Sequence, residues 1–182
     1  YDLVMRLGWQ PKSVDLATFV RDYAVRRYGD AAAPGMAVFL ARLLESVYAT
    51  DDWTPPQYQI WSAPGAGPHL ATRFHLIDKL RAALRVALNV TELHTSRLYI
   101  NDITDVCRQF LGELFNYHWV KLEEAFFRGE QDAFAHQAEV LCSLLSRQAD
   151  LLELHPEHRL STEIDRAIAA GVKVVLMDNS IP

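Results

Sequence analysis

Apolar side chains recur every three or four residues along most of this chain, which is the spacing of one face of an α-helix. The longest periodic run covers residues 96–128, a second covers residues 131–155, and Gly129 separates them. The apolar stripes are Tyr99, Ile103, Val106, Phe110, Leu114, Tyr117 and Leu122 in the first run, and Phe134, Ala138, Leu141, Leu145 and Leu152 in the second. Because the connection is short, the two helices are predicted to lie antiparallel. The pattern predicts an all-α fold, a helical bundle or array with a long antiparallel helix pair.

Shorter helices are predicted before this pair. Asp15 is a candidate N-cap for a helix that begins at Leu16 and stops at Gly29. Pro34 stands at a favoured first-turn position of the next helix. A third helix is expected over residues 71–88.

Other segments lack the long helical period. Residues 50–68 are rich in proline and carry Trp53, Tyr58 and Trp61, so an ordered loop is expected there. Residues 161–170 read as a last short helix, and the following VKVVLM is apolar and strand-like.

The composition is that of a globular chain of one domain. Of the 182 residues, half are hydrophobic, and the formal net charge is −5. An acidic chain lacks the basic face that binds phosphates, so no nucleic-acid partner is expected. No stretch approaches the roughly 20 consecutive apolar residues of a membrane span. The two cysteines, Cys107 and Cys142, lie in apolar helical stretches and are expected to be buried thiols.

The stretch RRYG, residues 26–29, offers a basic handle at the end of a predicted helix. Arg26 and Arg27 fall in the last turn, where cations complement the helix dipole, before the stop at Gly29. We therefore interpret the pair as structural, with capping and an ion pair as its role. The helical period places Arg27 on the same inward face as Phe19.

Motifs for catalysis or metal binding are weak. His155 and His158 form the tightest histidine pair, but Pro156 breaks the helical spacing between them. No glutamate is followed three residues later by histidine, as a di-iron bundle would require. There is no P-loop, no GxSxG and no CxxC motif. Neither a metal nor a cofactor is expected.

Three motifs, in order, resemble the family 89 glycoside hydrolases, the α-N-acetylglucosaminidases. The first motif is matched by Tyr1, Leu3, Met5, Leu7 and Trp9, with Arg6 where an acidic residue is common. The second is matched by Tyr23, Arg26, Arg27, Tyr28 and Gly29, and the third by Asp102, Asp105, Arg108 and Gln109. LLESVY at residues 43–48 also fits, and the resemblance runs over about residues 1–170.

This resemblance implies a three-part enzyme: a small α/β domain, a (β/α)8 barrel with two catalytic glutamates, and a helical C-terminal domain packed against the barrel. Such a hydrolase retains anomeric configuration, with its two carboxyl groups about 5 to 5.5 Å apart. Both glutamates are expected N-terminal to Tyr1, so this chain is expected to be inactive alone. Residues 1–12 would be the end of the barrel or a junction helix, and residues 13–182 the helical domain.

The resemblance also implies roles for individual residues. Tyr1 and Trp61 would lie near the substrate, although whether Trp61 faces a sugar or closes the edge of a core stays open. The residues expected to be structural are Trp9, Arg26, Arg27, Tyr28, Gly29, Asp105 and Arg108. The ending VKVVLMDNSIP departs from the Trp-Gly segment that the family carries near the sugar site.

Two functions follow. The first is the C-terminal helical domain of a retaining exo-α-N-acetylglucosaminidase, whose partners are the catalytic barrel of the same chain and a glycan ending in N-acetylglucosamine. The resemblance implies a lysosomal, secreted or periplasmic location for it. The alternative is a stand-alone helical protein-interaction module without catalytic activity.

Overall fold

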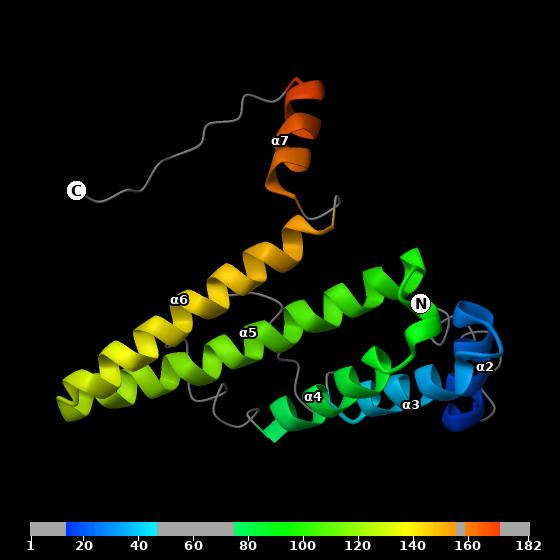
Figure 1. Ribbon diagram of the computed structural model, residues 1–182, viewed down its shortest axis with the longest axis horizontal. Helices are drawn as coiled ribbons and strands as arrows, with labels where there is room; N and C mark the ends of the chain where they lie inside the picture. The colour runs from blue at the N-terminus through cyan, green and yellow to red at the C-terminus, as the bar shows by residue number, and fades with distance from the viewer. Residues whose placement is uncertain (1–13, 47–74, 156–158, 172–182) are drawn as a thin grey trace.

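The computed structural model describes residues 14–46, 75–155 and 159–171. Within these ranges the chain forms α-helices, one short 3-10 helix and no strand (Figure 1). The elements are α2 (Leu16–Tyr28), α3 (Ala33–Leu44), α4 (His75–Leu88), η2 (Thr91–Leu93), α5 (Arg97–Arg128), α6 (Gln131–Glu153) and α7 (Leu160–Ala169). The predicted all-α fold is therefore confirmed. The predictions for residues 50–68 and for VKVVLM lie outside the described residues.

The ends of α2 and α3 follow the local signals in the sequence. Asp15 accepts a hydrogen bond from the Thr18 backbone N–H at 3.1 Å, which caps the first turn of α2. Gly29 ends this helix with φ of +85°, a conformation that glycine adopts without the steric cost of a Cβ. Pro34 lies in the first turn of α3, where its missing N–H leaves no helical hydrogen bond unmade. The predicted cap, stop and start are confirmed.

The larger hydrophobic core lies where α2, α3, α4 and the N-terminal part of α5 meet. Met36 and Phe39 of α3 are almost completely buried there, as are Leu80 and Ala87 of α4. Ala24 brings the inner face of α2 to the same core. The four helices therefore share one core, and the remainder of the long helix α5 extends beyond it (Figure 1).

Two close contacts fix this core. Tyr99 of α5 donates its hydroxyl hydrogen to the carbonyl oxygen of Ala87 at 3.0 Å, so its phenol is both buried and satisfied. Gly35 of α3 approaches the segment after α4 so closely that a Cβ there would lie 2.7 Å from Val90 Cγ2. Glycine at this position therefore allows α3 to pack tightly against the end of α4.

Helices α5 and α6 form the predicted long antiparallel pair (Figure 1). Gly129 has φ of +69° in the left-handed region, and Glu130 N–H donates to the Ala125 carbonyl oxygen at 3.0 Å across the turn. Phe115 of α5 and Leu141 and Leu144 of α6 form a second, smaller core between the two helices. None of the described helices is long and apolar enough to cross a membrane.

Three sequence expectations for α6 are wrong. Phe134 is 37% and Leu145 43% exposed, although both were expected in the buried stripe, and Cys142 is exposed rather than a buried thiol. Among the described elements, α6 packs mainly on α5, so only a narrow stripe of α6 is covered. Since adjacent residues on a helix point about 100° apart, Leu144 lies on the covered face and Leu145 turns away from it.

Candidate functional site

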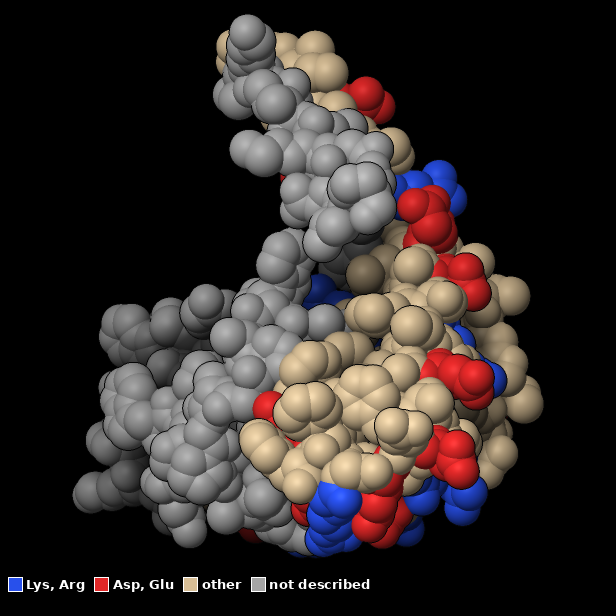
Figure 2. Space-filling view, turned by 90° about the vertical axis from the view of Figure 1, so that its left-hand side faces the viewer, with Lys and Arg blue, Asp and Glu red and all other residues tan. Residues whose placement is uncertain are grey.

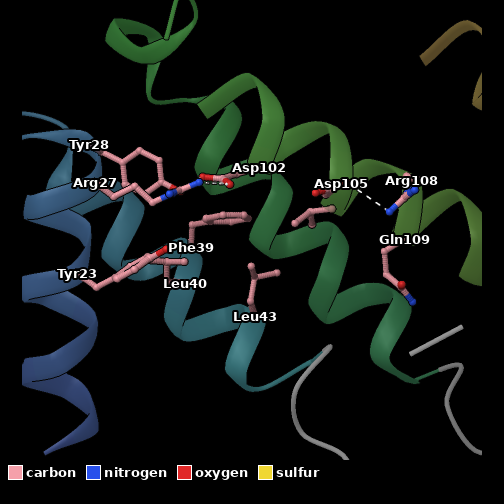
Figure 3. A pocket seen from close by; sticks show the side chains of 11 residues that line it. Tyr23, Arg27, Tyr28, Phe39, Leu40, Leu43, Asp102, Asp105, Arg108 and Gln109 are labelled. Atoms are coloured by element: carbon pink, nitrogen blue, oxygen red, sulfur yellow. Dashed lines mark hydrogen bonds and ion pairs between the residues drawn. The ribbon is translucent and has the colours of Figure 1, made fainter. Parts of the chain in front are cut away.

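An ion pair joins the last turn of α2 to the first turns of α5 (Figure 3). Arg27 donates from Nε to Asp102 Oδ2 at 2.7 Å and from Nη2 to Asp102 Oδ1 at 2.6 Å. The Tyr28 hydroxyl donates to Asp102 Oδ2 at 2.5 Å. One carboxylate therefore accepts three hydrogen bonds from two adjacent residues; we call Arg27, Tyr28 and Asp102 the clamp.

Arg27 and Tyr28 reach the same carboxylate although adjacent residues on a helix point about 100° apart. Tyr28 is buried in the main core and presents its hydroxyl toward α5. Arg27 is half-buried and lies beside it, with its guanidinium carbon 5.8 Å from the centre of the Tyr28 ring. Arg26, the preceding residue, is exposed. The two arginines thus have different surroundings, as the helical period requires of adjacent residues.

The surroundings of the clamp raise the pKa of both of its proton donors, Arg27 and Tyr28. The hydrogen bonds to Asp102 raise the pKa of Arg27 above its ordinary value. Burial, and secondly the hydrogen bond to Asp102, raises the pKa of Tyr28. Both donors therefore keep their protons near neutral pH, where neither serves as a proton acceptor.

A cavity of about 380 Å³ lies next to the clamp, between α2, α3 and α5 (Figure 3). It is lined by Tyr23, Arg27, Tyr28, Phe39, Leu40, Leu43, Asp102, Asp105, Val106, Arg108 and Gln109. Its apolar floor comes from α3, and its polar wall comes mainly from one face of α5.

The polar side chains of this wall each have at least one partner on α2 or α5. Arg108 Nη2 lies 3.2 Å from Asp105 Oδ1, one helical turn away on α5. Gln109 is buried and donates from Nε2 to Glu113 Oε1 at 2.8 Å. Both cavity carboxylates, Asp102 and Asp105, are thus engaged by arginines. Two-carboxylate glycoside hydrolysis needs one carboxyl as acid and another as nucleophile or base, whereas both carboxylates of this cavity are held by arginine side chains.

Metal binding finds no support in the part of the chain that the structure describes. No group of three histidine, cysteine, aspartate or glutamate side chains there could hold an ion. His155, one of the two histidines of HPEH, is buried with its Nε2 2.5 Å from Asn101 Oδ1, which links the end of α6 to the start of α5. His158 lies outside the described residues.

Comparison with protein families matches residues 19–174 to the model described as alpha-N-acetylglucosaminidase (NAGLU) C-terminal domain. The match covers most of the chain and all the residues of the clamp and its cavity. The chain belongs to this family. No curated protein and no solved structure gave a significant match.

Within this α-N-acetylglucosaminidase C-terminal domain, the residues predicted to be structural do not all lie at one place. Arg27, Tyr28, Asp105 and Arg108 meet at the cavity, while Arg26 is exposed on α2. Gly29 ends α2 beside the clamp. The remaining site predictions, Tyr1, Trp9 and Trp61, lie outside the described residues and stay predictions, as do the domain boundaries.

Two residues at this site had no assigned role from sequence. Asp102 was part of a matched motif, and the structure makes it the acceptor of the clamp. Gln109, from the same motif, is buried at the cavity wall. The available signal was their position at the start of a long amphipathic helix, since a polar residue expected on a buried face needs a partner.

Proposed function

We propose that this α-N-acetylglucosaminidase C-terminal domain is the non-catalytic helical part of a retaining exo-α-N-acetylglucosaminidase. In this proposal it packs against a catalytic (β/α)8 barrel of the same polypeptide, and the barrel removes terminal N-acetylglucosamine from glycans. The family match over residues 19–174 carries the proposal. The cavity carboxylates Asp102 and Asp105 support it, because each is held by an arginine of the domain itself and so has a structural partner.

The clamp gives this supporting role a physical basis. It ties the C-terminal end of α2, the first described helix, to the start of the long helix α5, and so fixes these two helices relative to each other. A charge-assisted bidentate pair fixes orientation as well as distance.

Hydrolysis of an aryl α-N-acetylglucosaminide tests the proposal. The 182-residue chain is expected to release no aryl alcohol, while the full polypeptide that carries it is expected to do so with retention of configuration. Release by the chain alone, abolished by Asp105→Asn, would show that the cavity is catalytic and overturn the proposal.

A stand-alone interaction module is the second candidate, and one observation favours it. At the turn between α5 and α6, Phe126 is 65% and Phe127 82% exposed, with ring centres 5.6 Å apart. Figure 2 views this end of the molecule and shows uncharged side chains gathered there, with acidic and basic residues beside them. Exposed aromatic clusters are typical of binding surfaces. A reading frame upstream of Tyr1 that encodes no barrel and no Glu-Gly step would favour this candidate.

A further inference from the structure

The outer faces of α2 and α3 form an apolar groove of about 820 Å³ on the side away from the clamp cavity. Three large apolar side chains of the groove are exposed: Leu16 at 44%, Val25 at 41% and Val38 at 46%. Ala37 and Leu44 continue the surface along α3. An exposed apolar surface rimmed by polar residues is a feature of contacts with another macromolecule.

The composition of α3 supports a covered groove. Its inner face buries Met36, Phe39 and Leu43 in the main core, while its outer face is also apolar. The single charged residue between Ala33 and Leu44 is Arg42, and it donates to the Ala82 carbonyl oxygen of α4 at 3.0 Å. A helix that is apolar on all sides is one that is buried on all sides in the complete protein.

The charges at the groove have the arrangement of an interface rim. Arg21, Asp30 and Glu45 are exposed and line the groove together with its apolar residues. They carry both signs, so the surface favours neither a nucleic acid nor an anionic membrane. An apolar centre with a mixed polar rim is the usual anatomy of a protein–protein contact.

The position of the groove in the chain points to its occupant. Leu16, the first residue of α2, lines the groove, so the groove lies at the N-terminal end of the described helices. The family description places this domain at the C-terminal side of its protein, so another domain precedes it. The covalent connection between the two domains holds the preceding one at high effective concentration near this end.

We propose that the groove between α2 and α3 is the surface that docks onto the preceding catalytic domain of the same polypeptide. This inference rests on the proposed function and adds the face by which the helical domain binds its barrel. Val38 is the groove residue best suited to a test, because it is exposed here and belongs to the helix that is apolar on all sides.

Thiol alkylation of single-cysteine substitutions in the full polypeptide tests the docking surface. Val38→Cys places a thiol in the groove, and Leu98→Cys on α5 is a matched control outside the groove with 48% exposure against 46%. Peptide mapping after iodoacetamide treatment reads each site separately from native cysteines. The Val38→Cys thiol is expected to react at least about tenfold more slowly than the Leu98→Cys thiol, since a covered thiol reacts only after local opening. Leu16→Cys is a second groove variant, and thermal melts confirm that each variant folds.

Three outcomes would overturn this docking surface. Equal reaction rates at the two positions would do so, as would faster reaction at Val38→Cys. Protection that is lost on dilution, together with a dimer in light scattering, would assign the groove to a second copy of the chain. Hydrolysis of the aryl glycoside by the same samples separates the two proposals. An active enzyme with a reactive Val38→Cys refutes the docking surface alone, whereas an inactive polypeptide with a protected Val38→Cys refutes the proposed function alone.

Discussion

Asp102 shows how one carboxylate can determine the contact between two helices. It receives hydrogen bonds from Arg27 and Tyr28, which are adjacent in sequence and lie at the end of α2. The Asp102 side chain is only 25% exposed, and the Arg27 side chain 29%. Because both are largely withdrawn from water, each depends on the other for its hydrogen bonds, and the loss of either leaves a poorly solvated charge.

Replacement of Tyr28 by phenylalanine isolates one of these bonds. The ring stays packed in the core while the hydrogen bond to Asp102 is lost, so the free energy of unfolding is expected to fall by about 1 to 2 kcal/mol at neutral pH. Urea unfolding followed by circular dichroism measures the change. Tyr23→Phe, five residues earlier on α2 and at the same cavity, is the matched control and should change stability by less than about 0.5 kcal/mol.

The difference in stability between wild type and Tyr28→Phe is expected to depend on pH in one direction. Burial and Asp102 raise the pKa of Tyr28 in the folded state, while the unfolded phenol titrates near pH 10. The stability contributed by the raised pKa is therefore complete below about pH 10 and is lost as the pH rises toward the folded-state pKa. The gap between wild type and Tyr28→Phe is expected to narrow above about pH 10. A gap that widens with alkaline pH would contradict the assigned role of the phenol.

At the scale of elements, the helix ends could be predicted from the sequence because their signals are local. Asp15, Gly29, Pro34 and Gly129 each act within one helical turn, through a cap, a positive φ or a missing N–H. Which face of a helix is covered is less certain from periodicity alone. Leu145 was assigned to the buried stripe of α6 because neighbouring positions fit a 3.6-residue period almost equally well.

The packing of α3 against the end of α4 gives an element-scale prediction at Gly35. Alanine normally stabilises a helix interior by about 0.5 to 1 kcal/mol relative to glycine. Here the added methyl group would lie 2.7 Å from Val90 Cγ2, and this valine is buried and branched at Cβ. Gly35→Ala is therefore expected to lower the free energy of unfolding by about 1 to 3 kcal/mol.

A double-mutant cycle with Val90→Ala checks the cause of this loss. If the Val90 methyl group is the obstacle, Gly35→Ala should cost less in the Val90→Ala background than in wild type. Chemical denaturation of the four proteins measures the coupling. Equal costs in both backgrounds, or a Gly35→Ala protein more stable than wild type, would show that the helices can separate freely here.

At the scale of the whole molecule, contacts between distant parts of the chain could not be predicted from spacing. Arg27 and Asp102 are 75 residues apart in sequence, and no local pattern pairs them. The helical period predicts that Arg27 faces inward and needs a partner, and Asp102 belongs to a recognised motif. Neither observation predicts that the two side chains are in contact. The α2–α3 groove could not be predicted from the sequence either, since the spacing of its apolar residues fits a buried face as well as an exposed one.

Substitutions in the clamp can distinguish a structural role of the helical domain from a substrate-binding role in the complete enzyme. If the clamp only holds α2 on α5, its loss should reduce stability and leave the affinity of the folded enzyme for its glycoside unchanged. If the clamp binds substrate, the order should reverse. Arg26, which is adjacent to Arg27 but exposed, provides the matched control.

The most direct measurement is therefore the thermal melt and KM of Arg27→Ala and Arg26→Ala in the full polypeptide. Arg27→Ala is expected to lose about 2 to 3 kcal/mol of stability, because Asp102 keeps only the Tyr28 hydrogen bond, while Arg26→Ala, at an exposed position, should change by less than about 1 kcal/mol. KM for an aryl α-N-acetylglucosaminide, measured well below the melting transition, should match wild type in both variants. An unchanged melt with a raised KM for Arg27→Ala would contradict the structural role of this domain.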